Sequence, residues 1–400
     1  MIRIYIRPLL DISLYTSFTL LHKMMTNYLS FLNPSLPDKT FDELKDLFNP
    51  KGIFVKYNED LGLFLVKYDK TKCNLMDPDI RMCRGLILDS FTNKIVCAPP
   101  QKSIDLNTFL NKVPSDNIIF EEFLDGTMIN LFYYKGDKYD GWLISTRSCI
   151  GANCRWYSER EFKDLFNECK DFDYELFNKE YCYTFVLQHP ENRIVEKLEN
   201  PRVVLVGVNK IEECGYNYVD TQIAIDELKE KGLELEMPKR FTFDNINDAI
   251  NSVTNMDYQQ QGYILKCGNL RTKIRNPKYN FVKSLRGNTN NYLKNYLELR
   301  QNGFLNSYLE FFPEMTEEFN GYMKTIHDIT NELFRHYQDC FVRKTKKHKD
   351  VPFIYKPLCF ELQKTYIETR QITTFTVVKN FINTMPVVRQ LFLFNNLDHE

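Results

Sequence analysis

The chain has 400 residues, of which 43% are apolar, 26% charged and 14% aromatic, and its formal net charge is -1. This is the composition of a globular protein with room for two or three domains, and the charge balance excludes a general polyanion binder. The eleven cysteines include no Cys-x-x-Cys pair and have no histidines at metal-ligand spacing, so we expect no structural zinc and a reducing compartment.

The first 23 residues carry two arginines and an apolar run that Asp11 interrupts. This segment has no small-residue cleavage site and is too short to span a membrane. A stretch typical of an amino terminus begins at Met24 and Met25. We therefore expect an amino-terminal extension at 1–23, a mixed domain at 24–287 and a helical domain at 288–400.

Periodicity and turn residues predict the elements of the mixed domain in chain order. Expected helices cover 37–48, with a cap at Asp38 or Thr40, then 162–166, 221–231 and 243–253, and expected strands cover 52–68, 84–89, 127–145, 181–188, 203–208 and 261–266. Beyond residue 288, apolar residues recur at helical spacing over 292–309, after Thr316 as a cap, and over 358–370 and 373–393.

Three short motifs place polar residues at the ends of predicted strands. Cys-Arg84-Gly precedes an apolar strand, Phe-Leu-Asp125-Gly126 forms a turn before a hairpin, and Pro190-Glu-Asn-Arg-Ile-Val195 follows a strand. In the Asp-Gly step, we expect glycine to supply backbone angles that a Cβ forbids. Each motif alone is compatible with an ordinary strand end.

Together these motifs resemble the nucleotidyltransferase core of RNA ligases of the phage T4 type, over roughly residues 54–285. The agreement is densest at 190–195, where Pro190, Asn192, Arg193, Ile194 and Val195 all follow the pattern. The resemblance implies an α+β fold, with a nucleotidyltransferase (ATP-grasp-like ligase) core of antiparallel sheets and flanking helices, followed by an all-α carboxy-terminal domain. It also implies a turn in which a Lys-x-Asp-Gly lysine takes AMP from ATP.

Three residues depart from that family at the positions that carry its chemistry. Phe123 stands where the lysine is expected, and no lysine occurs at 115–134. Val186 and Gln261 replace the two glutamates that hold the ribose or the metal. A nucleophilic amine and carboxylates with Mg²⁺ are what adenylylation requires, so we expect this site to have no catalytic residue and no metal.

The cations of the family pattern are mostly retained. The resemblance assigns phosphate or nucleotide binding in a relict cleft to Arg84, Asp125, Gly126, Arg147, Arg193, Lys266, Lys273 and Arg275. Two alternatives stay open: Arg147 can be an ordinary surface arginine, and the cleft can be filled by side chains and bind nothing.

The most basic run of the chain lies between predicted helices at 343–349. Arg343, Lys344, Lys346 and Lys347 can contact nucleic-acid phosphates, or they can form a solvated loop. The T4-type ligases also carry a helical carboxy-terminal domain that helps to hold RNA.

The sequence thus leads to three functional hypotheses. The first is an RNA-ligase-like pseudoenzyme that binds RNA, a nucleotide or a viral protein partner and requires no cofactor. The second is an active ATP-dependent RNA ligase with a displaced nucleophile, which needs ATP and Mg²⁺. The third is a structural virion component without nucleic-acid affinity. Richness in Asn, Tyr, Phe, Ile and Lys indicates an AT-biased genome, which with the ligase type suggests a large DNA virus. We expect no membrane association and a location in the cytoplasm or the virion.

Overall fold

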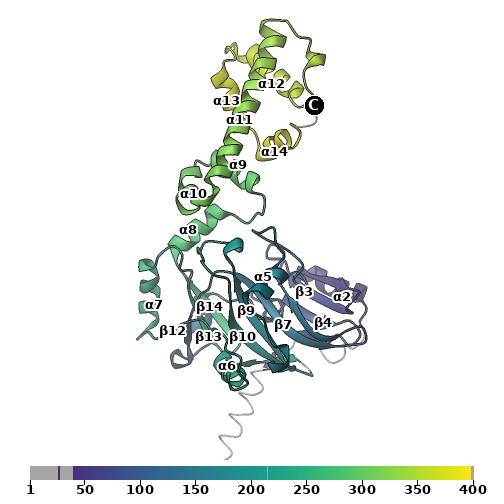
Figure 1. The fold of residues 1–400 in the computed structure, drawn as a ribbon, viewed down its shortest axis with the longest axis vertical. Helices are drawn as coiled ribbons and strands as arrows, with labels where there is room; N and C mark the ends of the chain where they lie inside the picture. The colour runs from purple at the N-terminus through teal and green to yellow at the C-terminus, as the bar shows by residue number, and fades with distance from the viewer. Residues whose placement is uncertain (1–25, 28–38, 214, 398–400) are drawn as a thin grey trace, which may run out of the picture. The chain divides into compact units, whose positions relative to one another are not determined.

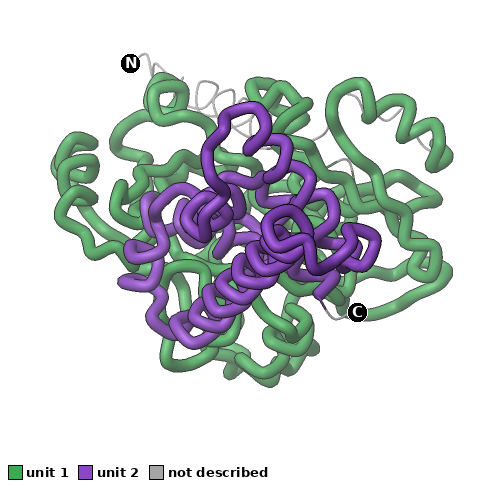
Figure 2. Tube along the Cα trace, turned by 90° about the horizontal axis from the view of Figure 1, so that it is seen from above, with its two compact units in different colours: residues 1–280 green, residues 281–400 purple. Residues whose placement is uncertain are grey.

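The structure, a computed structural model, describes residues 26–27, 39–213 and 215–397. These residues form two compact units, 1–280 and 281–400 (Figure 2). The expected extension at 1–23 lies outside the described residues. The boundary expected after residue 287 stays a prediction, since the helix α8 (Pro277–Arg286) begins in the first unit and ends in the second.

The first unit contains three sheets whose paired strands are all antiparallel among the described residues (Figure 1). The largest has the order β1 (Thr26–Asn27), β11 (Gly215–Val219), β10 (Arg202–Glu212), β9 (Tyr181–Gln188), β7 (Thr127–Lys135), β8 (Asp140–Ser145). A second has the order β12 (Arg240–Phe241), β6 (Ile119–Glu122), β13 (Gly262–Cys267), β14 (Leu270–Arg275), and the third β2 (Ile53–Asn58), β3 (Leu63–Tyr68), β4 (Arg84–Asp89), β5 (Ile95–Cys97).

Helices cover the apolar faces of these sheets. The helices of the first unit are α2 (Phe41–Phe48), α3 (Pro78–Met82), α4 (Leu106–Leu110), α5 (Phe162–Cys169), α6 (Thr221–Glu230) and α7 (Ile246–Ser252). Buried residues of α5 and α6, among them Phe166 and Leu228, pack with Phe185 and Leu205 of the six-stranded sheet. Burying such side chains contributes roughly 1.5–3 kcal/mol each.

Local signals in the sequence account for several helix ends. Thr40 forms a capping box with Glu43 at the start of α2, as expected from the sequence. The helix α7 starts after Asn245, whose side chain accepts from two backbone N–H groups, so the expected start at 243 was too early.

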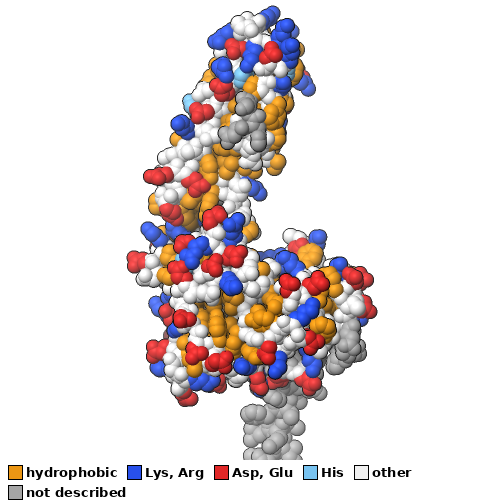
Figure 3. Space-filling model, turned by 45° about the vertical axis from the view of Figure 1, so that its right-hand side comes forward, with side chains coloured by type: hydrophobic (Ala, Val, Ile, Leu, Met, Phe, Trp, Pro, Cys, Tyr) orange, Lys and Arg blue, Asp and Glu red, His pale blue; other side chains and the backbone are white. Residues whose placement is uncertain are grey.

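All the regular elements of the second unit that the structure describes are helices. It contains α9 (Tyr292–Gln301), α10 (Leu305–Phe311), α11 (Thr316–Tyr337), α12 (Lys356–Thr369), α13 (Phe375–Thr384) and α14 (Val387–Asn395), with a π-helical turn at Gln338–Val342. Stacked rings of Tyr308, Phe312 and Phe319 form part of its core. Hydrophobic side chains also appear among charged ones on its surface (Figure 3).

Two long helices expected in this unit are divided. Gly303, at φ +74°, separates α9 from α10, and Pro386 separates α13 from α14. Thr316 is the first residue of α11 rather than its cap, and its hydroxyl donates to the carbonyl of Pro313. The α+β class, the antiparallel sheets and the helical carboxy-terminal region predicted from the sequence are confirmed.

Candidate functional site

The strand β14 presents a row of cations on one of its two faces. Successive side chains of a strand alternate between faces. Ile274 is buried in the apolar core below the sheet, together with Leu265 of β13. Arg271, Lys273 and Arg275 therefore share the opposite face.

Four further cations from distant segments act on this face. Lys70 and Lys102 follow β3 and β5, Arg84 begins β4, and Arg147 follows β8. Burial lowers the pKa values of Lys70, Arg84 and Lys102, and the positive charges of neighbouring cations lower them further. We call Lys70, Arg84, Lys102, Arg147, Arg271, Lys273 and Arg275 the cationic cluster.

Burial and like charge both oppose protonation of Lys273. Burial is the larger cause, and the charges of Arg271, Arg84, Arg275 and Lys102 add to it, lowering the pKa of Lys273 to about 5. Burial similarly lowers the pKa of Arg271 to about 9. Lys273 is therefore mostly neutral at pH 7 while nothing negative lies beside it.

Some donors of the cluster lack partners. The Nη2 of Arg147 donates to the backbone carbonyl of Tyr68 at 3.0 Å, and the Cζ of Arg147 lies 4.6 Å from the centroid of the Tyr68 ring. The Nε atoms of Arg147 and Arg271 are buried without a hydrogen-bond partner among the described residues. Within the same residues, no carboxylate forms an ion pair with any cluster member. An anionic ligand could satisfy these donors and compensate the charge.

Phe123 lies directly beside these cations. The Nζ of Lys273 is 4.4 Å from the centroid of the Phe123 ring, and the Cζ of Arg275 is 5.4 Å from it. The N–H of Phe123 donates to the carbonyl of Gly262 at 2.9 Å, which continues the pairing of β6 with β13. The side chain at position 123 thus faces the cations of β14.

Both carboxylate oxygens of Asp125 accept hydrogen bonds from other groups of the protein. Its Oδ2 accepts from the backbone N–H groups of Val195 at 2.9 Å and Glu196 at 3.0 Å, and its Oδ1 accepts from the hydroxyl of Tyr279 at 2.5 Å. Its carbonyl accepts from Gln188 at 2.7 Å. This side chain is a structural tie, and its expected contact with a nucleotide stays a prediction.

Gly126 is required for space rather than for its backbone angles. Its φ is not positive, so the expected reason for glycine was wrong. A Cβ at this position would lie 2.4 Å from the carbonyl oxygen of Leu187 and 2.6 Å from the Cγ1 of Val186. The turn therefore passes too close to β9 for any side chain.

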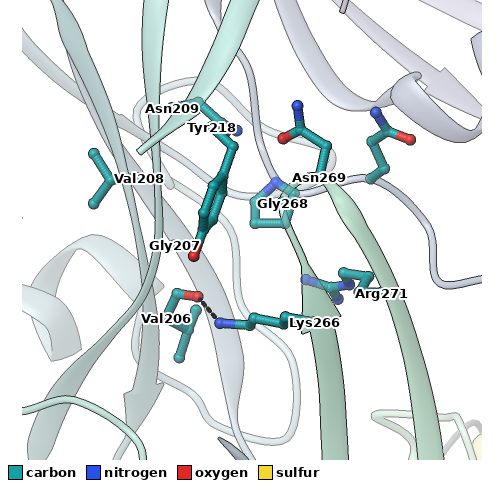
Figure 4. A pocket seen from close by; sticks show the side chains of 11 residues that line it. Val206, Gly207, Val208, Asn209, Tyr218, Lys266, Gly268, Asn269 and Arg271 are labelled. Atoms are coloured by element: carbon teal, nitrogen blue, oxygen red, sulfur yellow. Dashed lines mark hydrogen bonds between the residues drawn. The ribbon is translucent and has the colours of Figure 1, made fainter. Parts of the chain in front are cut away.

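Lys266 belongs to a different contact from the cationic cluster. Its ammonium forms an ion pair with Glu121 and donates to the carbonyl of Val206 at 2.7 Å, reaching from β13 across to β10 (Figure 4). Burial lowers the pKa of Lys266, and the Glu121 charge opposes that shift. Lys266 thus pairs with a carboxylate of the protein and does not join the other cations assigned to the cleft.

The cavity beside Lys266 has a volume of about 30 Å³ and is lined also by Gly207, Tyr218 and Asn269 (Figure 4). That volume is about one water molecule's share of the liquid. A nucleotide does not fit there.

The other expected residues occupy structural positions near the turn. Arg193 donates from Nε to the carbonyl of Val195 at 3.1 Å. Val186 lies on β9 opposite Met128, and the carbonyl of buried Gln261 accepts from the N–H of Asn276 at 3.1 Å. An alkyl group and an amide do not provide the charged oxygens that Mg²⁺ prefers, so these residues do not fit the metal that RNA ligases of the T4 type hold at these positions. In the part of the chain that the structure describes, no cluster of His, Cys, Asp or Glu could hold a metal ion.

The basic run lies within the second unit. Arg343 pairs with Asp339 at 3.2 Å, while Lys344 and Lys347 are exposed and Lys346 is half-buried. Lys344 adopts φ +57°. None of the described helices is both long and apolar enough to cross a membrane.

Sequence reasoning missed Lys70, Lys102 and Arg271 as members of the cluster. Arg271 could have been found, because it lies two residues before Lys273 on the same strand face. Lys70 and Lys102 reach the site from outside the strands, and no local pattern marks them.

No family model matches the chain. It is 30% identical over 147 residues to the RNA ligase of Rhodothermus phage RM378, covering 32% of each chain. It is 20% identical over 312 residues, 72% of this chain and 43% of the relative, to a protein of Autographa californica nuclear polyhedrosis virus named "Putative bifunctional polynucleotide kinase/RNA ligase". The chain thus spans less than half the length of these relatives. An archaeal ATP-dependent RNA ligase structure, at 12% identity, gives a TM-score of 0.43 over 71% of this chain and 74% of that one.

The chain is thus RNA-ligase-like in sequence, and its described residues form an α+β fold of antiparallel sheets with flanking helices. Its particular character is that Phe123 faces the cations where the resemblance places the lysine.

The tight approach of Gly126 to β9 gives a first prediction. We expect Gly126→Ala to lower the free energy of unfolding by about 1–3 kcal/mol, because the new methyl group must displace the β9 backbone. Urea unfolding followed by circular dichroism measures it. Gly321→Ala is the control, since a Cβ there meets nothing within 4 Å. A loss in Gly126→Ala no larger than in the control would contradict the steric explanation.

The low pKa of Lys273 gives a second prediction. Between pH about 5 and 10.5 the unfolded chain binds a proton that folded Lys273 does not, so stability rises with pH in this window. We expect Lys273→Met to flatten this dependence and to stabilise the protein at pH 7 by on the order of 2 kcal/mol, less than the full shift implies because solvent screens a partly exposed group. Thermal unfolding at several pH values tests this, with Lys229→Met on exposed α6 surface as control.

Proposed function

We propose that this chain acts by binding a polyphosphate, either a nucleoside triphosphate or the phosphorylated end of an RNA, at the cationic cluster. The observation that supports this most is the convergence of seven cations that form no ion pair with a described carboxylate. Assembling like charges is unfavourable, and a polyanion would compensate it. The unpartnered Nε atoms of Arg147 and Arg271 add two donors for phosphate oxygens.

In this proposal the protein is a pseudoenzyme of the RNA-ligase-like class. Phe123 cannot form a bond to phosphorus, and Val186 and Gln261 supply no charged metal ligand. The bound polyphosphate would be held, not transferred. We place the protein in the host cytoplasm or the virion of a large DNA virus, with RNA, a nucleotide or a viral protein as its partner. When the ligand is RNA, the exposed lysines of the basic run in the second unit would offer a contact of their own for its phosphates.

Binding should be linked to proton uptake. A phosphate beside Lys273 favours its ammonium form, so affinity for ATP should increase as the pH falls from about 8 to about 6, by up to about tenfold per pH unit. Isothermal titration in buffers with different ionisation enthalpies measures both the affinity and the proton uptake. Lys273→Met should remove the uptake, while Lys229→Met should retain it.

Variants at other residues of the cationic cluster test whether ATP binds there. Arg275→Gln should weaken ATP binding roughly tenfold, the value of a hydrogen bond to a charged group. The same series with a 5′-phosphorylated RNA separates the two ligands. If neither ATP nor RNA binds the wild-type chain, the proposal fails and the structural virion component without nucleic-acid affinity becomes the better account.

One contact favours a second candidate function, covalent adenylylation by Lys273. Its Nζ lies 4.4 Å from the centroid of the Phe123 ring and is mostly neutral at pH 7. In such a step the Nζ lone pair would attack the α-phosphorus of ATP, the bond from phosphorus to the bridging oxygen would break, pyrophosphate would leave, and the nitrogen would lose a proton to water.

Labelling distinguishes the two candidates. For the pseudoenzyme we expect no stable adduct when the protein is incubated with α-labelled ATP in the presence of Mg²⁺ or Mn²⁺ and analysed by denaturing gel and intact mass. We expect label to appear in the triple variant Phe123→Lys, Val186→Glu, Gln261→Glu, which restores the nucleophile and both carboxylates. A stoichiometric AMP adduct on the wild type that Lys273→Arg abolishes would instead establish the displaced nucleophile.

A further inference from the structure

The second unit contains a pocket that belongs to none of the features above. Its volume is about 580 Å³, and its walls come from α9, α11 and α13. Pockets for small molecules commonly have 300–1,000 Å³, so a single nucleotide fits this one. Every lining residue lies within the second unit.

The lining of this pocket is positively charged. Arg300 of α9, Lys324 of α11 and Lys379 of α13 all face it, and none of its nine lining residues is acidic. Across the described chain, these three cations form no ion pair with a carboxylate. The two lysines are exposed and so can reach a ligand at the mouth of the pocket.

One donor of Arg300 has no hydrogen-bond partner among the described residues. Its Nη2 donates to the side-chain oxygen of Asn383, which orients the guanidinium. Its Nη1 is buried and has no hydrogen-bond partner among the described residues, and burial lowers the pKa of the group. A buried donor of this kind is normally satisfied, and a phosphate oxygen would satisfy it.

The same pocket offers an aromatic surface. Phe375 of α13 is half-buried, and its ring centroid lies 6.0 Å from that of His327 at an interplanar angle of 70°. Ile326, 6% exposed, adds an apolar wall. Aromatic faces of this type stack with nucleobases independently of the base sequence.

We propose that this pocket binds a single nucleotide, with its base against Phe375 and its phosphate on Arg300, Lys324 and Lys379. A ligand that has both a flat apolar ring and an anionic group contacts both the aromatic and the cationic residues of the lining. The nucleotide can be free or can be an unpaired residue of a nucleic-acid strand, since both present the same groups. The site is separate from the cationic cluster, and so does not depend on the function proposed for that cluster.

The test is the binding of fluorescent etheno-AMP to the full chain carrying Lys273→Met and Arg275→Gln, followed by anisotropy. Removing those two cluster cations weakens binding at the first unit, and the pocket variants then report on the second unit. We expect saturable binding that weakens tenfold or more in Lys379→Glu and in Phe375→Ala. Lys364→Glu makes the same charge change on α12, outside the pocket, and should stay within twofold of its parent.

Competition identifies the ligand and its source. Unlabelled AMP should compete, whereas adenosine and inorganic phosphate should each compete at least tenfold less well. If a single-stranded hexanucleotide displaces etheno-AMP at a lower concentration than AMP does, the ligand of the pocket is an unpaired residue of a nucleic-acid strand. If the hexanucleotide does not displace it, the ligand is a free nucleotide. Absence of saturable binding, equal competition by inorganic phosphate, or unchanged affinity in Lys379→Glu would overturn the proposal. If Phe375→Ala does not fold, the double variant Lys324→Glu, Lys379→Glu tests the proposal in its place. Both lysines are exposed, so we expect this variant to fold and to bind etheno-AMP at least tenfold more weakly.

Discussion

The carboxylate of Asp125 is the contact on which the centre of the first unit depends. It joins the turn before β7 to the backbone after β9 and to the start of α8, segments that lie about 70 and 154 residues further along the chain. The residue is buried, so each of these hydrogen bonds replaces hydration that the carboxylate has lost. Removing the carboxylate would take this acceptor away from two backbone N–H groups and from the hydroxyl of Tyr279. The Asp-Gly turn therefore has a structural role that does not depend on any chemistry at position 123.

The same reasoning applies to the densest motif. Asn192 donates to the hydroxyl of Thr127 at 3.1 Å, Arg193 donates to the carbonyl of Val195, and the N–H of Val195 binds Asp125. These contacts hold the end of β9 against the start of β7. The contacts of Asp125, Asn192, Arg193 and Val195 thus have structural roles. Similarity at these positions therefore reports on the fold and does not establish an activity.

The sequence predicted several elements that depend on local signals, such as the cap of α2 at Thr40, one of the two residues considered. It did not predict β14 as a strand, although the alternation of Lys273 and Arg275 with Ile274 is also a local signal. The pairing of Lys266 with Glu121 could not be read from the sequence, because it requires knowing that β13 lies beside β6. The pocket of the second unit was equally inaccessible, since three helices that are distant in sequence form its walls.

The contact between Lys273 and the ring of Phe123 depends on the protonation state of the lysine. A cation–π contact requires a charged amine, whereas a lysine with a pKa of about 5 is mostly neutral at pH 7. Without a ligand, the contact is therefore mainly the packing of an amine against a ring. An anion beside Lys273 would favour protonation and so would strengthen both the ion pair with the ligand and the attraction to the ring. Under the proposed binding function, the ring at position 123 would therefore stabilise the ligand-bound state of the cluster more than its free state.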